Sequence, residues 1–258
     1  MDKRFENKVV LITGAGSGFG RMAAQRFADE GARLALSDVN AEGLAETAAS
    51  LKCEVISDVL DVTDEAQHIA HIAHIRDAFG TLDVAINNAG WGHDLKPLHM
   101  VSGDEFDRSI AINAKGVFLG MKHQLPMMHA AGGGAILNVA SAAGLVGAAM
   151  ISAYAAAKHA VVGLTRAAAD ENARKNIRVN ALCPSFSSTP MVQEMASQIE
   201  ARTGADRDTT YAQIANRIPM ARVSEPQEVV QAMLWICAPE NSFMTGQAIA
   251  IDGGLTAI

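Results

Sequence analysis

Short apolar runs alternate with longer segments of helical period over most of the chain. Most of these runs lack the polar and apolar alternation that marks a strand with one wet face, so we expect both faces to be covered. The pattern predicts strands at KVVLIT (8–13), RLALS (33–37), EVISDVL (54–60), LDVAIN (82–87), GAILNVA (134–140), IRVNALC (177–183) and QAIAID (247–252).

Amphipathic segments between these runs are expected to form helices, among them residues 20–30, 64–79, 104–129 and 153–174. Repeated alternation of strand and helix requires right-handed crossovers and predicts an α/β fold with a doubly wound parallel sheet. No repeat, low-complexity linker or change in composition divides the chain. Residues 1–258 are therefore expected to form a single domain.

Residues 185–219 interrupt this alternation. The stretch is polar but carries Met191, Met195, Ile199 and Ile214 at roughly helical spacing. Long excursions inside compact domains are often lids or binding loops. We therefore expect a substrate lid in this segment.

The composition narrows the class of protein. Of 258 residues, 49% are hydrophobic and 19% charged, which is typical of a soluble protein with a large core. A net charge of -7 without a run of Lys and Arg argues against nucleic acid or a membrane surface as a partner. Cys53, Cys183 and Cys237 lie far apart, as expected for buried thiols in a reducing compartment. With no apolar stretch long enough for a signal peptide or a membrane span, we expect a cytoplasmic protein.

Three histidines, His68, His71 and His74, lie three apart in HIAHIAHIRDAFG. The isoleucine after each of them is expected to face the core, which places the histidines on the surface. A zinc site requires a tighter cluster of ligands. No metal site is predicted.

A glycine-rich segment, TGAGSGFG (13–20), follows the first predicted strand and opens a helix. Glycines there let the backbone approach a pyrophosphate, and the helix N-terminus offers free N–H groups to it. The strict GxGxxG pattern fails, because Phe19 occupies its last position when counted from Gly14. The placement between a first strand and a first helix still favours a dinucleotide site over a purely structural turn.

Asp38 ends the second predicted strand, 18 residues after Gly20. A carboxylate there can accept hydrogen bonds from the adenosine ribose hydroxyls and would repel a 2′-phosphate. The glycine loop contains Ser17 and no basic residue, and no Lys or Arg directly follows Asp38. The alternative is a solvated carboxylate that caps the next helix. The pattern predicts NAD rather than NADP.

Other strand ends contribute polar residues to the same edge. Asp61 positions an adenine or caps the helix that starts near Asp64, and the sequence leaves both interpretations open. Asn87–Gly90, NNAG, closes the fourth strand where ligands of open α/β sheets bind, although a polar turn is the alternative. Trp91 and His93 follow directly, as substrate-crevice residues or as surface loop residues.

Tyr154 and Lys158 lie four apart in YAAAK, and such positions share one helix face at about 5–6 Å. A phenol of pKa about 10 requires about 4 kcal/mol to reach about 7. An ammonium at about 5.5 Å, with an effective dielectric near 20, supplies about 3 kcal/mol. A bound oxidised nicotinamide can supply the remainder. Tyr154 is thus a candidate acid/base, although core packing of the phenol is the alternative.

Two further residues complete this candidate site. Ser141 lies just beyond the fifth strand, where its hydroxyl can hold a substrate oxygen. Asn113 interrupts an apolar helix pattern, and a buried amide requires partners. It can anchor a water that links Lys158 to solvent.

Together these residues resemble the short-chain dehydrogenase/reductase family. The matching motifs are TGAGSGFG (13–20), Asp38, LDVTD (60–64), NNAG (87–90), Asn113, Ser141, YAAAK (154–158) and IDGG (251–254). The resemblance implies a seven-stranded Rossmann-like sheet with helices on both faces, hydride transfer between nicotinamide and a secondary alcohol or ketone, and a homotetramer. It makes Tyr154 the catalytic acid/base, with Lys158 lowering its pKa and binding the nicotinamide ribose. Ser141 then orients the substrate oxygen, and Asn113 supports the proton relay.

The resemblance also implies a set of cofactor contacts. They are Gly14, Ser17, Gly18, Phe19, Gly20, Asp38, Asp61, Val62, Asn88, Ala89, Gly90, Tyr154, Lys158, Pro184 and Thr189. One departure is Ser185, which follows Pro184 where the family commonly has glycine, and which restricts the backbone there and adds a hydroxyl. Thr189 matches the position that often holds the carboxamide.

The sequence therefore predicts an NAD-dependent oxidoreductase that acts on a secondary alcohol or ketone. A 3-oxoacyl thioester (acyl-carrier-protein) reductase is the first alternative, but it normally uses NADPH, which Asp38 disfavours. A non-catalytic NAD(H)-sensing regulator is the second, although such proteins typically lose the Tyr or Lys that this chain keeps. Apolar residues between Ser141 and Tyr154 favour a hydrophobic substrate.

Overall fold

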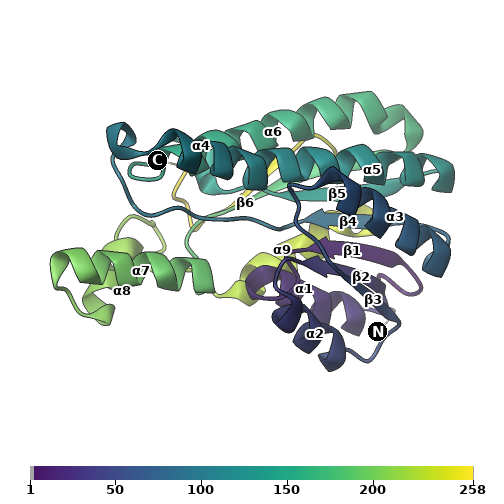
Figure 1. Ribbon diagram of the computed structural model, residues 1–258, viewed down its shortest axis with the longest axis horizontal. Helices are drawn as coiled ribbons and strands as arrows, with labels where there is room; N and C mark the ends of the chain where they lie inside the picture. Colours follow the sequence, from purple (N-terminus) through teal and green to yellow (C-terminus); the bar gives the residue numbers. More distant parts are fainter. Residues whose placement is uncertain (1–2, 258) are drawn as a thin grey trace.

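The computed structural model describes residues 3–257 and contains one seven-stranded parallel sheet in the order β3-β2-β1-β4-β5-β6-β7 (Figure 1). The strands are β1 (Val9–Thr13), β2 (Arg33–Asp38), β3 (Val55–Val59), β4 (Val84–Asn87), β5 (Gly134–Val139), β6 (Ile177–Pro184) and β7 (Ala248–Ile251). Every predicted strand is present, with its ends within two residues of the expected positions. The predicted fold class is confirmed.

Helices cover both faces of the sheet. They are α1 (Gly18–Asp29), α2 (Ala41–Ser50), α3 (Glu65–Phe79), α4 (Gly103–Ile110), α5 (Gly116–Ala131), α6 (Ser152–Asn172), α7 (Pro190–Thr203), α8 (Arg207–Ala215) and α9 (Pro226–Cys237). Figure 1 shows α1, α2 and α9 on one face and α3, α5 and α6 on the other. None of the helices within residues 3–257 combines the length and the apolar character needed to cross a bilayer.

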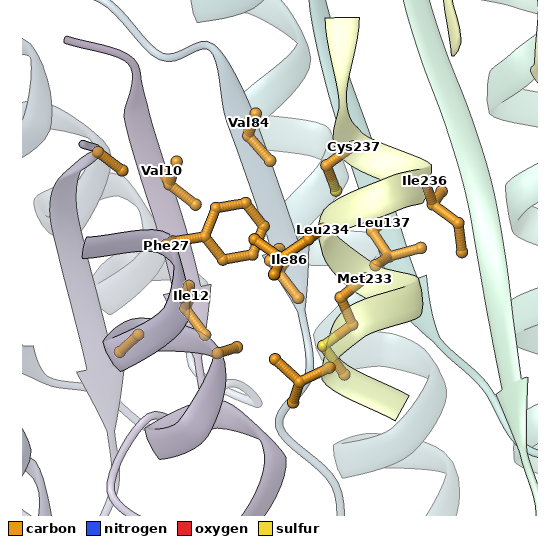
Figure 2. Packing of buried hydrophobic residues seen from close by; sticks show 14 of the residues in the cluster. Val10, Ile12, Phe27, Val84, Ile86, Leu137, Met233, Leu234, Ile236 and Cys237 are labelled. Carbon is orange, nitrogen blue, oxygen red and sulfur yellow. The ribbon is translucent and has the colours of Figure 1, made fainter. Parts of the chain in front are cut away.

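Each face of the sheet has its own hydrophobic core. On one face, Val10 and Ile12 of β1 pack with Phe27 of α1 and Leu234 of α9 (Figure 2). The neighbouring β1 residues point the other way, and Leu11 belongs to the core beneath α3, α5 and α6. Successive side chains of a strand alternate between faces, so a strand buried on both faces is apolar throughout. This explains why the strands appear in the sequence as unbroken apolar runs.

The strand order reverses beside β1, which pairs with β2 on one side and with β4 on the other. Such a reversal opens a crevice at the carboxyl ends of the two strands. The Thr13 hydroxyl joins these ends, because its Oγ1 accepts hydrogen bonds from the backbone N–H groups of Asn88 and Ala89, both at 3.0 Å. The glycine turn after β1 is thereby fixed against the loop after β4.

Residues 104–129, expected as one helix, form α4, a π-helical turn at Ala111–Lys115, and α5. A π-helical turn inserts an extra residue into the helix and is frequent at functional sites. Asn113 lies within this turn and is fully buried. The helix is therefore widened at the polar residue that interrupts the sequence pattern.

The segment 185–219 contains the helices α7 and α8, joined at Gly204 in a left-handed conformation with φ of 71°. In Figure 1 this pair projects to one side of the sheet. The side chain of Gln198 on α7 holds the loop after β4: its Oε1 accepts from the Leu95 N–H at 3.0 Å, and its Nε2 donates to Asp94 Oδ1 at 3.0 Å. The expected excursion is thus a helical pair attached to that loop.

The expectation that His68 and His71 lie on the surface is wrong. The core face of α3 passes through His68, His71, Ile75 and Phe79, at helical intervals of three and four. The side chain of Ile69 is 53% exposed instead. Because an isoleucine follows each histidine, the sequence pattern did not determine which of the two series faces inward.

The buried histidines are paired with neighbouring polar groups. His68 Nε2 lies 3.0 Å from the Val62 carbonyl oxygen, and His71 Nδ1 lies 2.6 Å from Asp58 Oδ2 of β3. The hydrogen bond from His71, followed by that from His74, lowers the pKa of the Asp58 carboxyl against the opposing effect of burial. Within residues 3–257 no group of three or more His, Cys, Asp and Glu side chains has a geometry suited to a metal.

Candidate active site

The turn after β1 has the geometry of an anion cradle. Gly14 and Gly18 adopt left-handed backbone conformations with φ of 67° and 50°, which glycine reaches without a steric penalty. Ser17 is the N-cap of α1, and its side chain makes no capping hydrogen bond with the described residues. The first turn of α1 contains no acidic residue. The helix N–H groups and the Ser17 hydroxyl are therefore available to a pyrophosphate.

Gly20 allows α1 to pack closely on this turn. A Cβ atom at Gly20 would lie 2.0 Å from the carbonyl oxygen of Gly14 and 2.7 Å from Asn88 Nδ2. That Asn88 amide nitrogen donates to the carbonyl oxygens of Thr13 at 2.9 Å and Gly14 at 3.2 Å. The Phe19 side chain is partly buried and packs against the core.

Replacing Gly20 with alanine is expected to lower the free energy of unfolding by about 1–3 kcal/mol or more, because the new methyl group overlaps backbone atoms. Gly163 on α6 is the matched control, since a Cβ there meets nothing within 4 Å. Alanine at Gly163 should add about 0.5–1 kcal/mol. Thermal unfolding of both variants checks the difference; equal midpoints would show that the close packing at Gly20 is absent.

Asp38 lies at the end of β2, beside the glycine turn. Its Oδ2 accepts from the Gly16 N–H at 2.8 Å, and its Oδ1 accepts from the Asn40 N–H at 2.8 Å. These bonds fix the orientation of a half-buried carboxylate, whose oxygens retain further lone pairs. The N-cap of α2 is Asn40, whose side chain accepts from the Gly43 N–H. The alternative role of Asp38 as a helix cap is therefore wrong.

Asp61 is exposed beyond the end of β3. Its Oδ1 accepts from the backbone and the hydroxyl of Thr63, at 2.9 and 2.8 Å. Asp64 is the N-cap of α3, so the alternative in which Asp61 caps this helix is wrong. The next residue, Val62, is buried and packs on Gly116, where a Cβ would lie 2.8 Å from Val62 Cγ2.

Gly90 lies where two candidate catalytic residues meet. A Cβ there would lie 3.1 Å from Asn113 Oδ1 and 3.6 Å from Lys158 Nζ. Asn113 Oδ1 accepts from the Trp91 N–H at 2.9 Å, and its Nδ2 donates to the Trp91 carbonyl at 2.8 Å. Asn113 thus fixes the loop after β4, and its part in a proton relay stays a prediction.

Tyr154 and Lys158 lie one turn apart on α6, with Lys158 Nζ 5.5 Å from the centre of the Tyr154 ring. The predicted separation is confirmed. Lys158 is buried, with 2% exposure, and its ammonium donates to the Val139 carbonyl at 2.7 Å. The end of β5 therefore holds the lysine in place.

Burial dominates the ionisation of this pair. It raises the pKa of the half-buried Tyr154 to about 12, and a hydrogen bond from Ser141 opposes part of the rise. It lowers the pKa of Lys158 to about 8. Desolvation disfavours both charged forms and so opposes the lowering of the Tyr154 pKa by Lys158, which stays a prediction.

Ser141 directly follows β5 and starts a short 3-10 turn at Ala142–Gly144. Its Oγ accepts from the Ala143 N–H at 3.2 Å and donates weakly to the Pro184 carbonyl at 3.5 Å. Its hydrogen bond with Tyr154 places both hydroxyls together. The structure thus brings Asn113, Ser141, Tyr154 and Lys158 to the carboxyl edge of the sheet.

The start of α7 lies beside the glycine turn. A Cβ on Gly18 would be 3.8 Å from Pro190 Cδ. Thr189 is the buried N-cap of α7, and its hydroxyl donates to the Ser187 carbonyl at 3.3 Å. Ser185, the departure from the family pattern, donates its N–H to the Ile251 carbonyl at 3.3 Å. The contact of Thr189 with the carboxamide stays a prediction.

A buried amide network beneath the site was not predicted. Asn87 Nδ2 donates to Asn138 Oδ1 at 2.8 Å and to Gln124 Oε1 at 3.1 Å. Asn138 Nδ2 donates to the Thr165 hydroxyl at 2.9 Å. The available signal was a single asparagine in each of two otherwise apolar strands. Thr13 was quoted only as part of the glycine segment, and its bridging role was also missed.

Comparison with known proteins agrees with this geometry. A family model described as enoyl-(acyl carrier protein) reductase matches residues 14–256. Levodione reductase of Leifsonia aquatica is 40% identical over 98% of this chain and 96% of that protein. This chain is a short-chain dehydrogenase/reductase. It is an oxidoreductase that acts on alcohol and carbonyl groups with a nicotinamide cofactor.

Two further relatives of this short-chain dehydrogenase/reductase are named for ring substrates. Cyclohexanol dehydrogenase of an Acinetobacter species is 35% identical over 100% of this chain and 98% of that protein. A 2,5-dichloro-2,5-cyclohexadiene-1,4-diol dehydrogenase of Sphingobium indicum is 41% identical over 97% of this chain and 98% of that protein.

Solved structures of two short-chain dehydrogenases match the whole fold. Levodione reductase has a TM-score of 0.94 at 38% identity, covering 98% of this chain and 99% of that one. NAD+-bound xylitol dehydrogenase has a TM-score of 0.93 at 34% identity, covering 98% of this chain and 100% of that one.

Proposed function

We propose that this protein is an NAD-dependent dehydrogenase that interconverts a cyclic secondary alcohol and its ketone. The observation that carries the proposal is the convergence of Tyr154, Lys158 and Ser141 at the sheet edge that also bears the glycine cradle. Three relatives act, by their names, on levodione, cyclohexanol and a cyclohexadiene diol. A six-membered carbocycle is therefore the substrate class we infer.

The preference for NAD rests on Asp38. Its carboxylate is oriented beside the glycine turn, where it can accept from both ribose hydroxyls and repel a 2′-phosphate. The guanidinium of Arg21 also lies at this turn, but it bonds the Gly16 carbonyl at 2.6 Å and pairs with Glu46 at 2.8 Å. The xylitol dehydrogenase of similar structure binds NAD+. We infer that the other cofactor contacts implied by the resemblance are also made. Among the residues that make them are Ser17, Gly18, Asp61, Val62, Ala89 and Thr189.

In alcohol oxidation, Tyr154 accepts the hydroxyl proton while the substrate carbon loses a hydride and becomes a carbonyl carbon. Bound nicotinamide supplies the hydride acceptor in this direction and the hydride donor in the other. Ser141 holds the substrate oxygen through its hydroxyl. Lys158, held by the Val139 carbonyl, provides the positive charge that stabilises the tyrosinate and binds the ribose. Burial raises the pKa of Tyr154 to about 12, and positive charge in the complex opposes this rise.

Half-buried and exposed apolar side chains frame the substrate space. Leu145, Val146 and Met150 lie between Ser141 and Tyr154, and Met191 is the second residue of α7. We infer that residues 185–219 close over this space as a lid, within one domain of residues 1–258.

We infer a homotetramer in the cytoplasm. Phe106 on α4 and Phe118 on α5 are 44% and 46% exposed, and Trp235 on α9 is 48% exposed, and we infer that these side chains are covered in subunit contacts. The described cysteines Cys53, Cys183 and Cys237 are all free thiols, in keeping with a reducing compartment. With a net charge of -7, neither nucleic acid nor a membrane is the inferred partner.

A 3-oxoacyl thioester reductase is the second candidate. A 3-oxoacyl-[acyl-carrier-protein] reductase of Thermotoga maritima is 38% identical over 98% of this chain. Asp38 weighs against it, because that activity normally uses NADPH. The NAD(H)-sensing regulator is less well supported, since the complete tetrad converges at the site.

The test follows reduced-nicotinamide absorbance with NAD or NADP and a panel of cyclohexanol, acyclic secondary alcohols and a 3-hydroxyacyl thioester. Turnover of cyclohexanol with NAD is the expected result. Selective turnover of the thioester with NADP would support the second candidate instead. Tight NADH binding without turnover of any alcohol would support the sensor.

A further inference from the structure

His93, in the loop after β4, carries a buried imidazole. The side chain is 6% exposed. Its Nδ1 lies 2.7 Å from the Asp94 carbonyl oxygen, whereas its Nε2 is buried with no hydrogen-bond partner among residues 3–257. Buried polar atoms in proteins are nearly always paired, so this nitrogen lacks the partner that such an atom normally has.

The bond to Asp94 fixes what Nε2 can recognise. A carbonyl oxygen only accepts, so Nδ1 of His93 carries a proton. In the neutral ring the other nitrogen then has a lone pair and no hydrogen. His93 Nε2 is therefore a hydrogen-bond acceptor, and it matches a hydroxyl group.

The position of His93 connects it with the catalytic groups. It follows Gly90 by three residues, so the chain separates them by at most about 10–11 Å. Gly90 itself lies against Asn113 and Lys158. Between them, Trp91 is held through its backbone by Asn113. The loop therefore starts at the catalytic residues.

The other end of the loop is held by the elements that frame the substrate space. Asp94 and Leu95 are bound by Gln198 of α7, and the Lys96 N–H donates to the Met150 carbonyl at 2.8 Å. A Cβ on Gly92 would lie 3.5 Å from Met191 Cγ, so the start of α7 covers this part of the loop. The loop that carries His93 thus runs from the catalytic residues to the inferred lid.

We propose that His93 Nε2, which is buried in this structure, becomes accessible when the inferred lid moves and then accepts a hydrogen bond from a second hydroxyl group of the substrate, remote from the carbon that reacts. The preferred substrate is then a ring with two oxygen substituents, a diol or a hydroxyketone, rather than a simple cyclic alcohol. This inference rests on the proposed function, since it names the substrate within the proposed class. A site that bonds a substrate hydroxyl strongly disfavours the analogue without it, because its own buried group then stays unpaired.

The test compares cyclohexane-1,4-diol with cyclohexanol as substrates with NAD. For the unmodified protein we expect the ratio of kcat/KM for diol to cyclohexanol to be about 10 or more. In His93→Phe the ratio should fall to about two, the statistical advantage of two equivalent hydroxyls, because the ring keeps its shape but loses the acceptor. His93→Gln, whose amide oxygen accepts, should restore part of the ratio. His99→Phe, at an exposed histidine beyond the same loop, is the matched control and should keep the full ratio.

The outcomes separate this inference from the proposed function. Oxidation of cyclohexanol with no preference for the diol would retain the proposed function and overturn the role of His93. A His93→Phe variant that keeps the full ratio would also overturn it. If neither ring is oxidised, the proposed function fails, and the 15N resonance of His93 Nε2 tests the inference directly. Addition of the diol to the NADH complex should shift that resonance, and an unchanged resonance would reject the inference.

Discussion

Replacing Tyr154 with phenylalanine is expected to lower kcat/KM for alcohol oxidation by roughly 10³–10⁴-fold, within the range that general acid–base catalysis contributes. The substitution removes only the hydroxyl oxygen that accepts the substrate proton. The ring that packs 5.5 Å from Lys158 Nζ stays in place. The dissociation constant for NADH, measured by fluorescence titration, should therefore change by less than about threefold.

The chain offers a matched control for this experiment, because Tyr211 on α8 is its only other tyrosine. Tyr211→Phe should keep the rate of the unmodified protein. Substantial activity in Tyr154→Phe would remove Tyr154 from the proton step.

The pH profile provides a second readout for Tyr154. The phenol must lose its proton before it can accept one, and burial raises its pKa. Oxidation should therefore slow as the pH falls below the pKa that Tyr154 has in the complex, and carbonyl reduction should slow as the pH rises above it. The residual rate of Tyr154→Phe should lack this dependence.

Replacing Asp38 with alanine is expected to lower the ratio of kcat/KM for NAD to kcat/KM for NADP by about 100-fold. Loss of a hydrogen bond to a charged group costs about 1.5–3 kcal/mol, or about 10–100-fold, with NAD. Removal of the negative charge also relieves its repulsion of the 2′-phosphate. Initial rates with both cofactors at a fixed alcohol concentration measure the ratio.

Asp38→Asn is the control that separates charge from hydrogen bonding, since an amide oxygen still accepts from the Gly16 N–H. It should relax discrimination against NADP while retaining more activity with NAD than alanine does. An unchanged cofactor ratio in both variants would show that Asp38 does not recognise the ribose. Thermal unfolding of each variant reports any loosening of the glycine turn.

The sheet could be predicted because its strands are buried on both faces, which leaves continuous apolar runs in the sequence. The inward side of α3 could not, since His71 and its neighbour Ile72 sit in a pattern that fits either orientation. Packing against Asp58 of β3, distant along the chain, decided it. The π-helical turn at Ala111–Lys115 likewise depends on the contact between Asn113 and the loop after β4.

The candidate site could be assembled from the sequence because the carboxyl ends of parallel strands meet at one edge. Tyr154 and Lys158 lie together as their helical spacing predicts. Their ionisation could not be predicted from spacing, because it depends on how deeply the fold buries them. Whether His93 lies in the substrate crevice or on the surface also could not be predicted from the sequence. The structure shows that its side chain is buried, with one ring nitrogen paired and the other without a partner among residues 3–257.

The amide network beneath the site has a consequence for folding fidelity. Asn87 and Asn138 are directly paired across β4 and β5, and their side chains bond to each other. A slip of either strand by one residue would turn its asparagine to the opposite face and leave its partner unsatisfied. Misaligned pairing of these two apolar strands therefore costs free energy, because it leaves a buried amide without its partner. Since Gly90 follows β4 and Ser141 follows β5, the network also keeps the two halves of the catalytic apparatus in register.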